Sequence, residues 1–309
     1  MAKLISIIAP VYNEERNIPD FYGALKETLD KLPYDFEVIF VNDGSSDKSY
    51  EFLKDIANGD KRIKIIDFSR NFGKEIAITA GVNYCRGDAC IMIDTDLQHP
   101  IEKIPEFLEK WERGAEIVIG VRKKNKGEGM IKKLGSYLFY KIINRISDTK
   151  IISRATDYRL LDRIVIDEFN KLTEKNRMTR ALIDWLGFNR EYVYFIANAR
   201  KYGKPSYSFW KLMRLAFNSI VSFSLFPLKL AGYLGIIITL FSGLLGIFIF
   251  ITKYITNTLY FSGPAILAVI NLFLIGIVLI CLGLIALYIA NIHSEVNNRP
   301  LYIIRQRRK

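Results

Sequence analysis

The chain has 309 residues, half of them hydrophobic, and its 44 Lys and Arg against 32 Asp and Glu give a net charge of +12. This length accommodates one domain of about 200 residues and a smaller second part. The charge indicates an anionic partner such as acidic lipid or a phosphorylated substrate. The basic residues form no single long arm, so we expect no nucleic-acid partner. Three cysteines show neither metal-ligand spacing nor a disulfide framework.

The first 120 residues alternate short apolar segments with amphipathic helical patterns. The expected strands are 4–9, 36–41, 63–68, 89–93 and 117–121. Strands that alternate with helices predict βαβ units, hence an α/β fold with a mostly parallel sheet. Ligands of such sheets bind beyond the carboxyl ends of the strands. Three charged residues each come just after an expected strand, and so at this edge of the sheet: Asp43, Asp94 and Arg122.

Two carboxylates and an amide follow the apolar segment 89–93, namely Asp94, Asp96 and Gln98. Hard oxygen ligands of this kind suit Mg²⁺ or Mn²⁺, which keep coordination positions free for substrate phosphates. A metal held there would neutralise a departing diphosphate. Arg122 would add a second cation; the alternative is an ordinary surface arginine.

Two polar turns lie at the same edge of the expected sheet. PVYNE at 10–14 follows the first strand, and NDGSSD at 42–47 follows the second. Asp43 and Glu14 could accept hydrogen bonds from a base or from ribose hydroxyls. The alternative for 42–47 is a turn that caps the following helix, and the two roles are compatible.

The C-terminal third predicts a membrane protein. Segment 208–226 carries one narrow polar stripe on an otherwise apolar helix, which is typical of a helix in the membrane interface; packing against the first domain is the alternative. Segments 230–252 and 265–290 contain no charged residue, and each exceeds the roughly 20 residues that cross a bilayer. Basic residues after the second segment predict that both ends of this hairpin face the cytoplasm. Its glycines permit close helix contacts, including a homo-oligomer.

Four motifs occur in order: PVYNE at 10–14, NDGSSD at 42–47, SRNFGK at 69–74 and DTDLQHP at 94–100. Together they resemble family 2 glycosyltransferases with the Rossmann-like GT-A fold, and the hairpin makes the chain similar to the polyprenyl-phosphate branch. The resemblance implies a nucleotide sugar, a polyprenyl-phosphate acceptor and Mg²⁺ or Mn²⁺. It also implies an integral protein of the bacterial plasma membrane. The expected parts are a cytoplasmic catalytic domain (1–205), a juxtamembrane helix (206–228) and a hairpin with a basic tail (229–309).

The resemblance also implies roles for individual residues. Those expected to bind the nucleotide are Pro10, Tyr12, Glu14, Asp43 and Asp94. The metal and diphosphate would be held by Asp94, Asp96 and Gln98. TDYR at 156–159 matches the region where the family places an acidic residue and an arginine near the acceptor. The expected catalytic residues are therefore Asp157, Asp96 and Arg122, and the acceptor phosphate would contact Arg159, Arg200 and Lys204. His99 stands where the family commonly has an aspartate.

The expected reaction is a hexosyl transfer by single displacement with inversion. A lipid phosphate is largely ionised at neutral pH and needs little help from a base, so Asp157 either orients the acceptor or assists as a base. UDP-glucose is the first expected donor; GDP-mannose, UDP-N-acetylhexosamine and UDP-aminoarabinose are alternatives. A processive synthase would carry a Gln-x-x-Arg-Trp signature and more spans. A nucleotidyltransferase would not require the hairpin, and a membrane scaffold would leave the acidic cluster unexplained.

Overall fold

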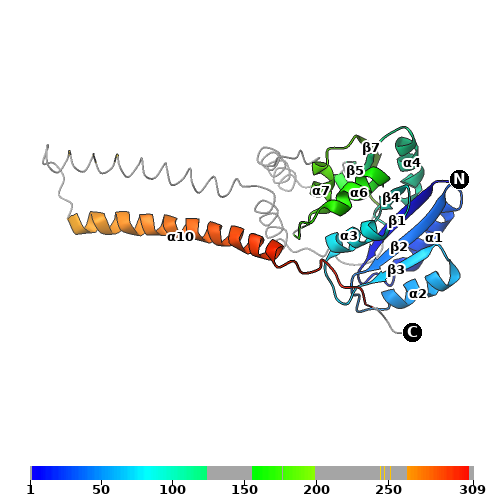
Figure 1. The fold of residues 1–309 in the computed structure, drawn as a ribbon, viewed down its shortest axis with the longest axis horizontal. Helices are drawn as coiled ribbons and strands as arrows, with labels where there is room; N and C mark the ends of the chain where they lie inside the picture. The colour runs from blue at the N-terminus through cyan, green and yellow to red at the C-terminus, as the bar shows by residue number, and fades with distance from the viewer. Residues whose placement is uncertain are drawn as a thin grey trace. The chain divides into compact units, whose positions relative to one another are not determined.

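The computed structural model describes residues 2–123, 155–175, 177–198 and 263–305, with the single positions 244, 247 and 251 (Figure 1). The chain divides into two compact units, residues 1–206 with 299–309 and residues 207–298. Several predictions lie outside the described residues: the helix at 206–228, nearly all of the first membrane segment, Arg200 and Lys204. The expected domain boundaries stay a prediction.

The first unit is built on a seven-stranded sheet with the order β3-β2-β1-β4-β6-β5-β7. Its strands are β1 (Leu4–Val11), β2 (Asp35–Asn42), β3 (Ile63–Asp67), β4 (Ala89–Met92), β5 (Ile117–Arg122), β6 (Ala155–Asp162) and β7 (Arg190–Phe195). Strand β6 runs antiparallel to both β4 and β5, and the other four pairs are parallel. This confirms the predicted α/β fold with a mostly parallel sheet.

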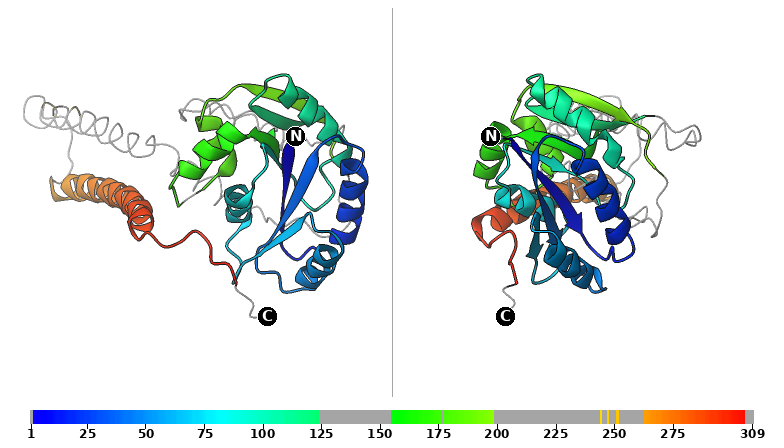
Figure 2. Two further views of the ribbon diagram at one scale, coloured as in Figure 1. Left: turned by 45° about the vertical axis from the view of Figure 1, so that its right-hand side comes forward. Right: turned by 90° about the vertical axis from the view of Figure 1, so that its right-hand side faces the viewer.

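Helices cover both faces of this sheet. They are α1 (Ile18–Leu29), α2 (Ser49–Gly59), α3 (Lys74–Tyr84), α4 (Ile104–Glu112), α6 (Arg163–Lys171) and α7 (Thr179–Trp185), with a 3-10 turn at Ile101–Lys103. Figure 2 shows α1 and α2 (blue) on one side of β1–β3 and α3 (cyan) on the other. Because both faces are covered, the middle of β1 is buried without alternation, as expected for a parallel strand.

The C-terminal helix α10 covers Gly263–Val296, and so includes the second predicted membrane segment. Many of its described large hydrophobic side chains are exposed, among them Leu267, Val278, Leu282, Ile289, Ile292 and Val296. Over the part of the chain that the structure describes, no helix was found long and apolar enough to cross a membrane. The predicted hairpin is therefore not confirmed.

Strand β6 carries the TDYR motif, and the sequence analysis did not predict it. Its first half contains the adjacent polar residues Thr156 and Asp157, and only Tyr158–Leu161 are buried. A strand that runs antiparallel between β4 and β5 does not belong to the repeating parallel βαβ pattern on which the prediction rested.

A buried ion pair ties β6 to α7. The Arg159 and Asp184 side chains are only 1% and 2% exposed, and Arg159 Nη1 lies 2.9 Å from Asp184 Oδ1. Arg159 Nε also donates to the carbonyl of Thr156 at 3.2 Å. Burial lowers the pKa of Arg159, and Asp184 opposes that shift. Both charges are thus compensated inside the protein, and neither faces solvent.

Removing one member of this pair should destabilise the fold, because the other charge stays buried without its partner. We predict that Asp184→Ala costs about 3–5 kcal/mol of unfolding free energy, equivalent to a fall in Tm of about 10 °C for a domain of this size. The measurement is thermal unfolding of the full chain in detergent. Glu27→Ala, which removes an exposed ion pair with Lys31, is the control and should leave Tm unchanged. Equal melting of both variants would contradict this view of the pair.

Candidate active site

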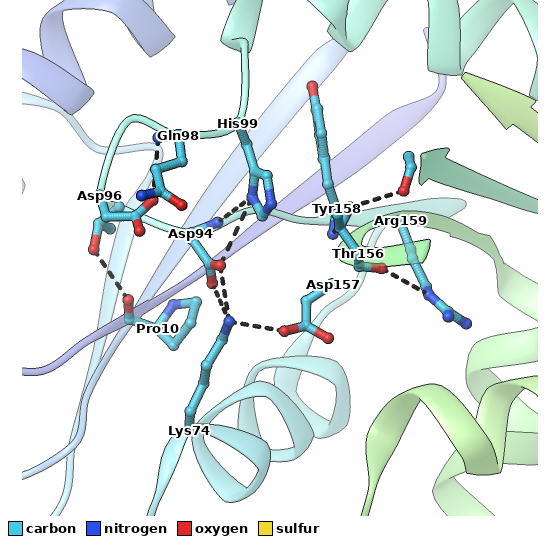
Figure 3. Close-up of polar contacts among 12 residues, drawn as sticks. Pro10, Lys74, Asp94, Asp96, Gln98, His99, Thr156, Asp157, Tyr158 and Arg159 are labelled. Atoms are coloured by element: carbon cyan, nitrogen blue, oxygen red, sulfur yellow. Dashed lines mark hydrogen bonds and ion pairs between the residues drawn. The ribbon is translucent and has the colours of Figure 1, made fainter. Parts of the chain in front are cut away.

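The candidate site lies at the carboxyl edge of the parallel strands. Asp43 follows β2 and Asp94 follows β4, as the sequence predicted. Strand β6 reaches the same edge from the opposite direction, since Met92 of β4 pairs with Arg159 of β6. Asp94 lies two residues after Met92 and Asp157 two residues before Arg159, so this antiparallel register brings Asp157 beside Asp94. Figure 3 shows the two carboxylates facing each other across this edge.

The Lys74 ammonium lies between these two carboxylates (Figure 3). Its Nζ is 2.7 Å from Asp94 Oδ1 and 2.8 Å from Asp157 Oδ2. Lys74 is the first residue of α3, so the start of that helix is fixed to both strand ends. Burial lowers the pKa of Lys74, but Asp94 and Asp157 outweigh burial and raise it above its usual value. The ammonium is therefore charged at neutral pH.

Asp157 has a second cationic neighbour, because Arg180 Nε lies 2.9 Å from its Oδ1. Burial raises the pKa of Asp157, but Lys74 and Arg180 outweigh burial, and the net shift is below the usual range. A carboxylate so strongly favoured in its ionised form is a weak proton acceptor. The geometry therefore suits Asp157 to holding two cations in place better than to general-base catalysis.

The segment from Asp94 to His99 is fixed by its own hydrogen bonds. Thr95 Oγ1 donates to the carbonyl of Pro10 at 3.3 Å, and Gln98 N donates to Asp96 Oδ1 at 3.1 Å. Asp94 N donates to His99 Nδ1 at 3.3 Å, which makes Nδ1 an acceptor and places the imidazole proton on Nε2. The His99 ring is buried and stacks on Tyr158. His99 therefore orients the segment from inside the core.

Arg122 is brought to this segment as well. Its Nη2 donates to Gln98 Oε1 at 3.3 Å, so a cation lies beside the predicted metal and diphosphate residues. Arg122 is the last residue of β5. This strand pairs with β6 on one side and β7 on the other, so it is not an edge strand. The structure thus places Arg122 where the sequence analysis expected it, while its role stays a prediction.

The predicted nucleotide residue Asp43 is only 2% exposed and holds a neighbouring segment. Its carboxylate accepts hydrogen bonds from Phe72 N at 2.7 Å and Gly73 N at 2.9 Å. Burial raises the pKa of Asp43, and these two N–H groups oppose the shift. The adjacent Gly44 has a φ of +64°, and a Cβ there would lie 2.4 Å from the Arg70 carbonyl carbon. Only glycine fits so close to that backbone.

The remaining nucleotide candidates lie around the first polar turn. Tyr12 is 49% exposed, so its ring is accessible to a ligand. The Glu14 carboxylate accepts from the Asn17 amide, and Glu14 N donates to Ser49 Oγ at 2.8 Å. Pro10 contributes its carbonyl to Thr95. These contacts order the turn beside Asp43.

Arg159 is not brought to the cluster around Lys74. Its guanidinium is buried against Asp184, and its expected contact with an acceptor phosphate stays a prediction. Two residues that the sequence analysis gave no role contact Asp157 instead, namely Lys74 and Arg180. Lys74 is the last residue of the SRNFGK motif, so the sequence contained a signal that could have marked it as a site residue. Arg180 stands in no motif, and only the packing of α7 brings it here.

The carboxylates fit a divalent metal in part. Within residues 2–123, 155–175, 177–198 and 263–305, no group of three or more His, Cys, Asp or Glu is placed to hold a metal ion. Asp94, Asp96 and Gln98 supply two carboxylates and one amide, which leaves coordination positions for phosphate oxygens and water. The Lys74 ammonium on Asp94 shows that this carboxylate already accepts a cation. The residues thus fit a metal ion whose coordination is completed by oxygens of the substrate and water.

A mostly parallel α/β sheet with carboxylates at its carboxyl edge has its polar groups where sheets of this class bind their ligands. Residues 6–169 match Glycosyl transferase family 2, which is more than half of the chain. The chain belongs to glycosyltransferase family 2 and is an enzyme of the hexosyltransferase class.

Relatives match almost the whole chain. The uncharacterized glycosyltransferase YkcC of Bacillus subtilis is 44% identical over 97% of this chain and 93% of its own length. The SfII prophage-derived bactoprenol glucosyl transferase of Shigella flexneri is 38% identical over 98% and 97%. Among solved structures, glucosyl-3-phosphoglycerate synthase from Mycobacterium tuberculosis is 17% identical, with a TM-score of 0.51 over 71% of this chain and 78% of that one. This last similarity supports the fold alone.

Replacing Lys74 should impair sugar transfer, because its ammonium bridges Asp94 and Asp157. We predict that Lys74→Met lowers kcat by roughly 100-fold, the usual effect of removing one preorganised group that stabilises developing charge. The measurement is the initial rate of nucleotide release from the donor. Lys103→Met, which removes a surface contact with Glu106, is the control and should keep the native rate. A native rate in Lys74→Met would show that the bridge serves no catalytic purpose.

Proposed function

We propose that the enzyme transfers a sugar, glucose from UDP-glucose in the first instance, to the phosphate of a polyprenyl lipid. The observation that carries this proposal is the Lys74 ammonium held between Asp94 and Asp157. One carboxylate belongs to the proposed donor side and the other to the proposed acceptor side. A cation shared between them lies where a leaving diphosphate and an incoming phosphate would both be negative. The similarity to a bactoprenol glucosyl transferase over nearly its whole length supports the lipid acceptor.

On the donor side, the chain's own residues bind and orient the nucleotide. Tyr12 and Glu14 lie at the first turn, and the buried carboxylate of Asp43 lies beside them. We propose that Asp94, Asp96 and Gln98 hold a Mg²⁺ or Mn²⁺ ion. When bound, such an ion neutralises charge on the departing diphosphate. Lys74 and Arg122 would add two fixed positive charges at the same edge of the sheet.

On the acceptor side, the lipid phosphate is itself the nucleophile. One of its oxygens attacks the anomeric carbon while the bond from that carbon to the diphosphate breaks, and the bonding electrons leave with the nucleoside diphosphate. This single displacement inverts the anomeric configuration. No proton must leave an ionised phosphate, which agrees with the lowered pKa of Asp157. Asp157 would orient Lys74 and Arg180 toward the phosphate, and Arg159, Arg200 and Lys204 remain proposed acceptor residues.

We further propose that a two-helix hairpin anchors the enzyme in the bacterial plasma membrane, with the catalytic domain and both ends in the cytoplasm. The uncharged segments 230–252 and 265–290 support this proposal. The exposed apolar side chains along α10 support it too, since such a surface is costly in water. Segment 206–228 would lie in the membrane interface, where it would bring the catalytic domain to the lipid phosphate, and glycines of the spans would permit a homo-oligomer.

A donor panel tests the proposed reaction. Purified enzyme in detergent is incubated with polyprenyl phosphate and radiolabelled UDP-glucose, GDP-mannose, UDP-N-acetylglucosamine or UDP-aminoarabinose, with Mg²⁺, Mn²⁺ or chelator. We expect a labelled lipid from UDP-glucose that requires the metal. Asp94→Asn should lower its formation by at least about 100-fold.

The control for the donor panel is Asp167→Asn, an exposed position paired only locally with Arg163, which should retain native activity. A folded enzyme that labels no lipid with any of the four donors would refute the proposed acceptor. Label transfer that is indifferent to chelator would refute the proposed metal.

Labelling with a membrane-impermeant maleimide tests the proposed topology. In a variant whose three native cysteines are alanine, Asn257→Cys lies between the two segments, and Lys31→Cys lies at an exposed position just after α1. The hairpin predicts that intact cells expose only the cysteine at position 257, and that lysis exposes both. Labelling of both positions in intact cells, or of neither, would contradict this orientation.

A further inference from the structure

The short segment 299–305, which follows α10 in the sequence, belongs to the catalytic unit and pairs with the chain just after β3. We call residues 299–305 the tail. Phe68 and Ile304 form an antiparallel bridge. Ser69 N donates to the Ile303 carbonyl at 2.9 Å, and Arg305 N donates to the Asp67 carbonyl at 2.7 Å. Figure 1 shows the tail (red) running back to the sheet beside β3.

Side chains reinforce this pairing. The Tyr302 ring stacks on the fully buried Phe68 ring, with centroids 5.1 Å apart and planes at 17°. Tyr302 Oη accepts from Asn83 Nδ2 of α3 at 3.2 Å. Arg305 Nη2 donates to the Ser69 carbonyl at 2.8 Å. The tail therefore touches both the residues after β3 and helix α3.

The segment that follows β3 contacts the tail at Phe68 and Ser69, and its last residues, 72–74, contact the candidate site. Phe72 N and Gly73 N donate to the Asp43 carboxylate, and the next residue is Lys74, which bridges Asp94 and Asp157. Phe72 also packs edge-on against Phe68, with ring centroids 5.5 Å apart. Phe68 thus contacts the tail on one side and the segment that holds Asp43 on the other.

We propose that Tyr302 and Arg305 are positioning residues for donor binding, and that they act through the segment 67–74. This inference rests on the proposed role of Asp43 and Asp94 toward the nucleotide. The tail fixes one end of the segment, so that the amides of Phe72 and Gly73 stay on Asp43 and Lys74 stays between the two carboxylates. Without the tail, the segment loses its backbone pairing at Asp67 and Ser69, and the donor site loses its preorganised geometry.

The proposal predicts a selective kinetic defect. Tyr302→Ala and Arg305→Ala should each raise the donor KM and weaken the binding of UDP with Mn²⁺ by roughly tenfold, since small misplacements of binding groups have effects of this order. The KM for polyprenyl phosphate should stay unchanged. Tyr302→Phe keeps the ring stack and should remain close to native. A merely structural role would instead lower the active fraction, and hence kcat, without changing either KM.

The experiment uses the full chain in detergent. Donor and acceptor KM are measured for the native enzyme and the variants, together with calorimetric binding of UDP and Mn²⁺ and hydrogen exchange of the amides at 68–73. Ile303→Ala is the matched control, because Ile303 is 53% exposed and pairs through its carbonyl. It should behave as the native chain, whereas Tyr302→Ala and Arg305→Ala should lose amide protection at Phe72 and Gly73.

Failure of the proposed reaction can be told apart from failure of this inference. A native enzyme that binds UDP with Mn²⁺ but labels no lipid refutes the proposed acceptor and leaves the binding and exchange measurements to decide the role of the tail. Unchanged UDP affinity and unchanged exchange in both Tyr302→Ala and Arg305→Ala would overturn the inference. An equal rise of donor and acceptor KM would overturn it too, because the defect would not be specific to the donor side.

Discussion

The bridge from Lys74 to Asp94 and Asp157 is the interaction on which the rest of the site depends. It joins the first residue of α3 to the end of the next strand, β4, and to the start of β6, which lies far away in the sequence. Two carboxylates this close together would otherwise repel each other, and the ammonium allows both to stay ionised. Asp157 is then a fixed anion among cations, which suits a reaction whose nucleophile arrives already ionised.

The bridge exists because of one antiparallel strand. Strand β6 enters the sheet between β4 and β5, and its register with β4 puts Asp157 at the same edge as Asp94. The buried pair between Arg159 and Asp184 secures β6 to α7, and α7 in turn supplies Arg180 to Asp157. Strand β6 thus serves both stability and chemistry: Arg159 forms the buried pair with Asp184, and Asp157, two residues earlier, belongs to the candidate site. The tail adds a second support from the other side, through Phe68 and the segment that carries Lys74.

The parallel half of the fold could be predicted from the sequence, since β1 to β5 each appear as apolar segments bounded by helical patterns or polar turns. The same rule placed Asp43, Asp94 and Arg122 at one edge, and each lies there. Strand β6 escaped because its polar residues Thr156 and Asp157 break the apolar pattern. Contacts between side chains of distant elements could not be predicted either. No local sequence pattern indicates that Arg159 points into the core or that Arg180 points toward Asp157. The pairing of the tail with Asp67 and Ser69 is also a long-range contact without a local signal.

The central claim is that Asp94 and Asp157 serve different substrates although one lysine bridges them. The most direct measurement is the kinetics of Asp157→Asn, with UDP and Mn²⁺ binding measured on the same protein. The account predicts a kcat for transfer to polyprenyl phosphate lowered by roughly 100-fold with nucleotide affinity close to native, because the donor side keeps Asp94, Asp96 and Gln98. Native turnover in Asp157→Asn, or loss of nucleotide binding equal to the loss of turnover, would contradict the division of the site.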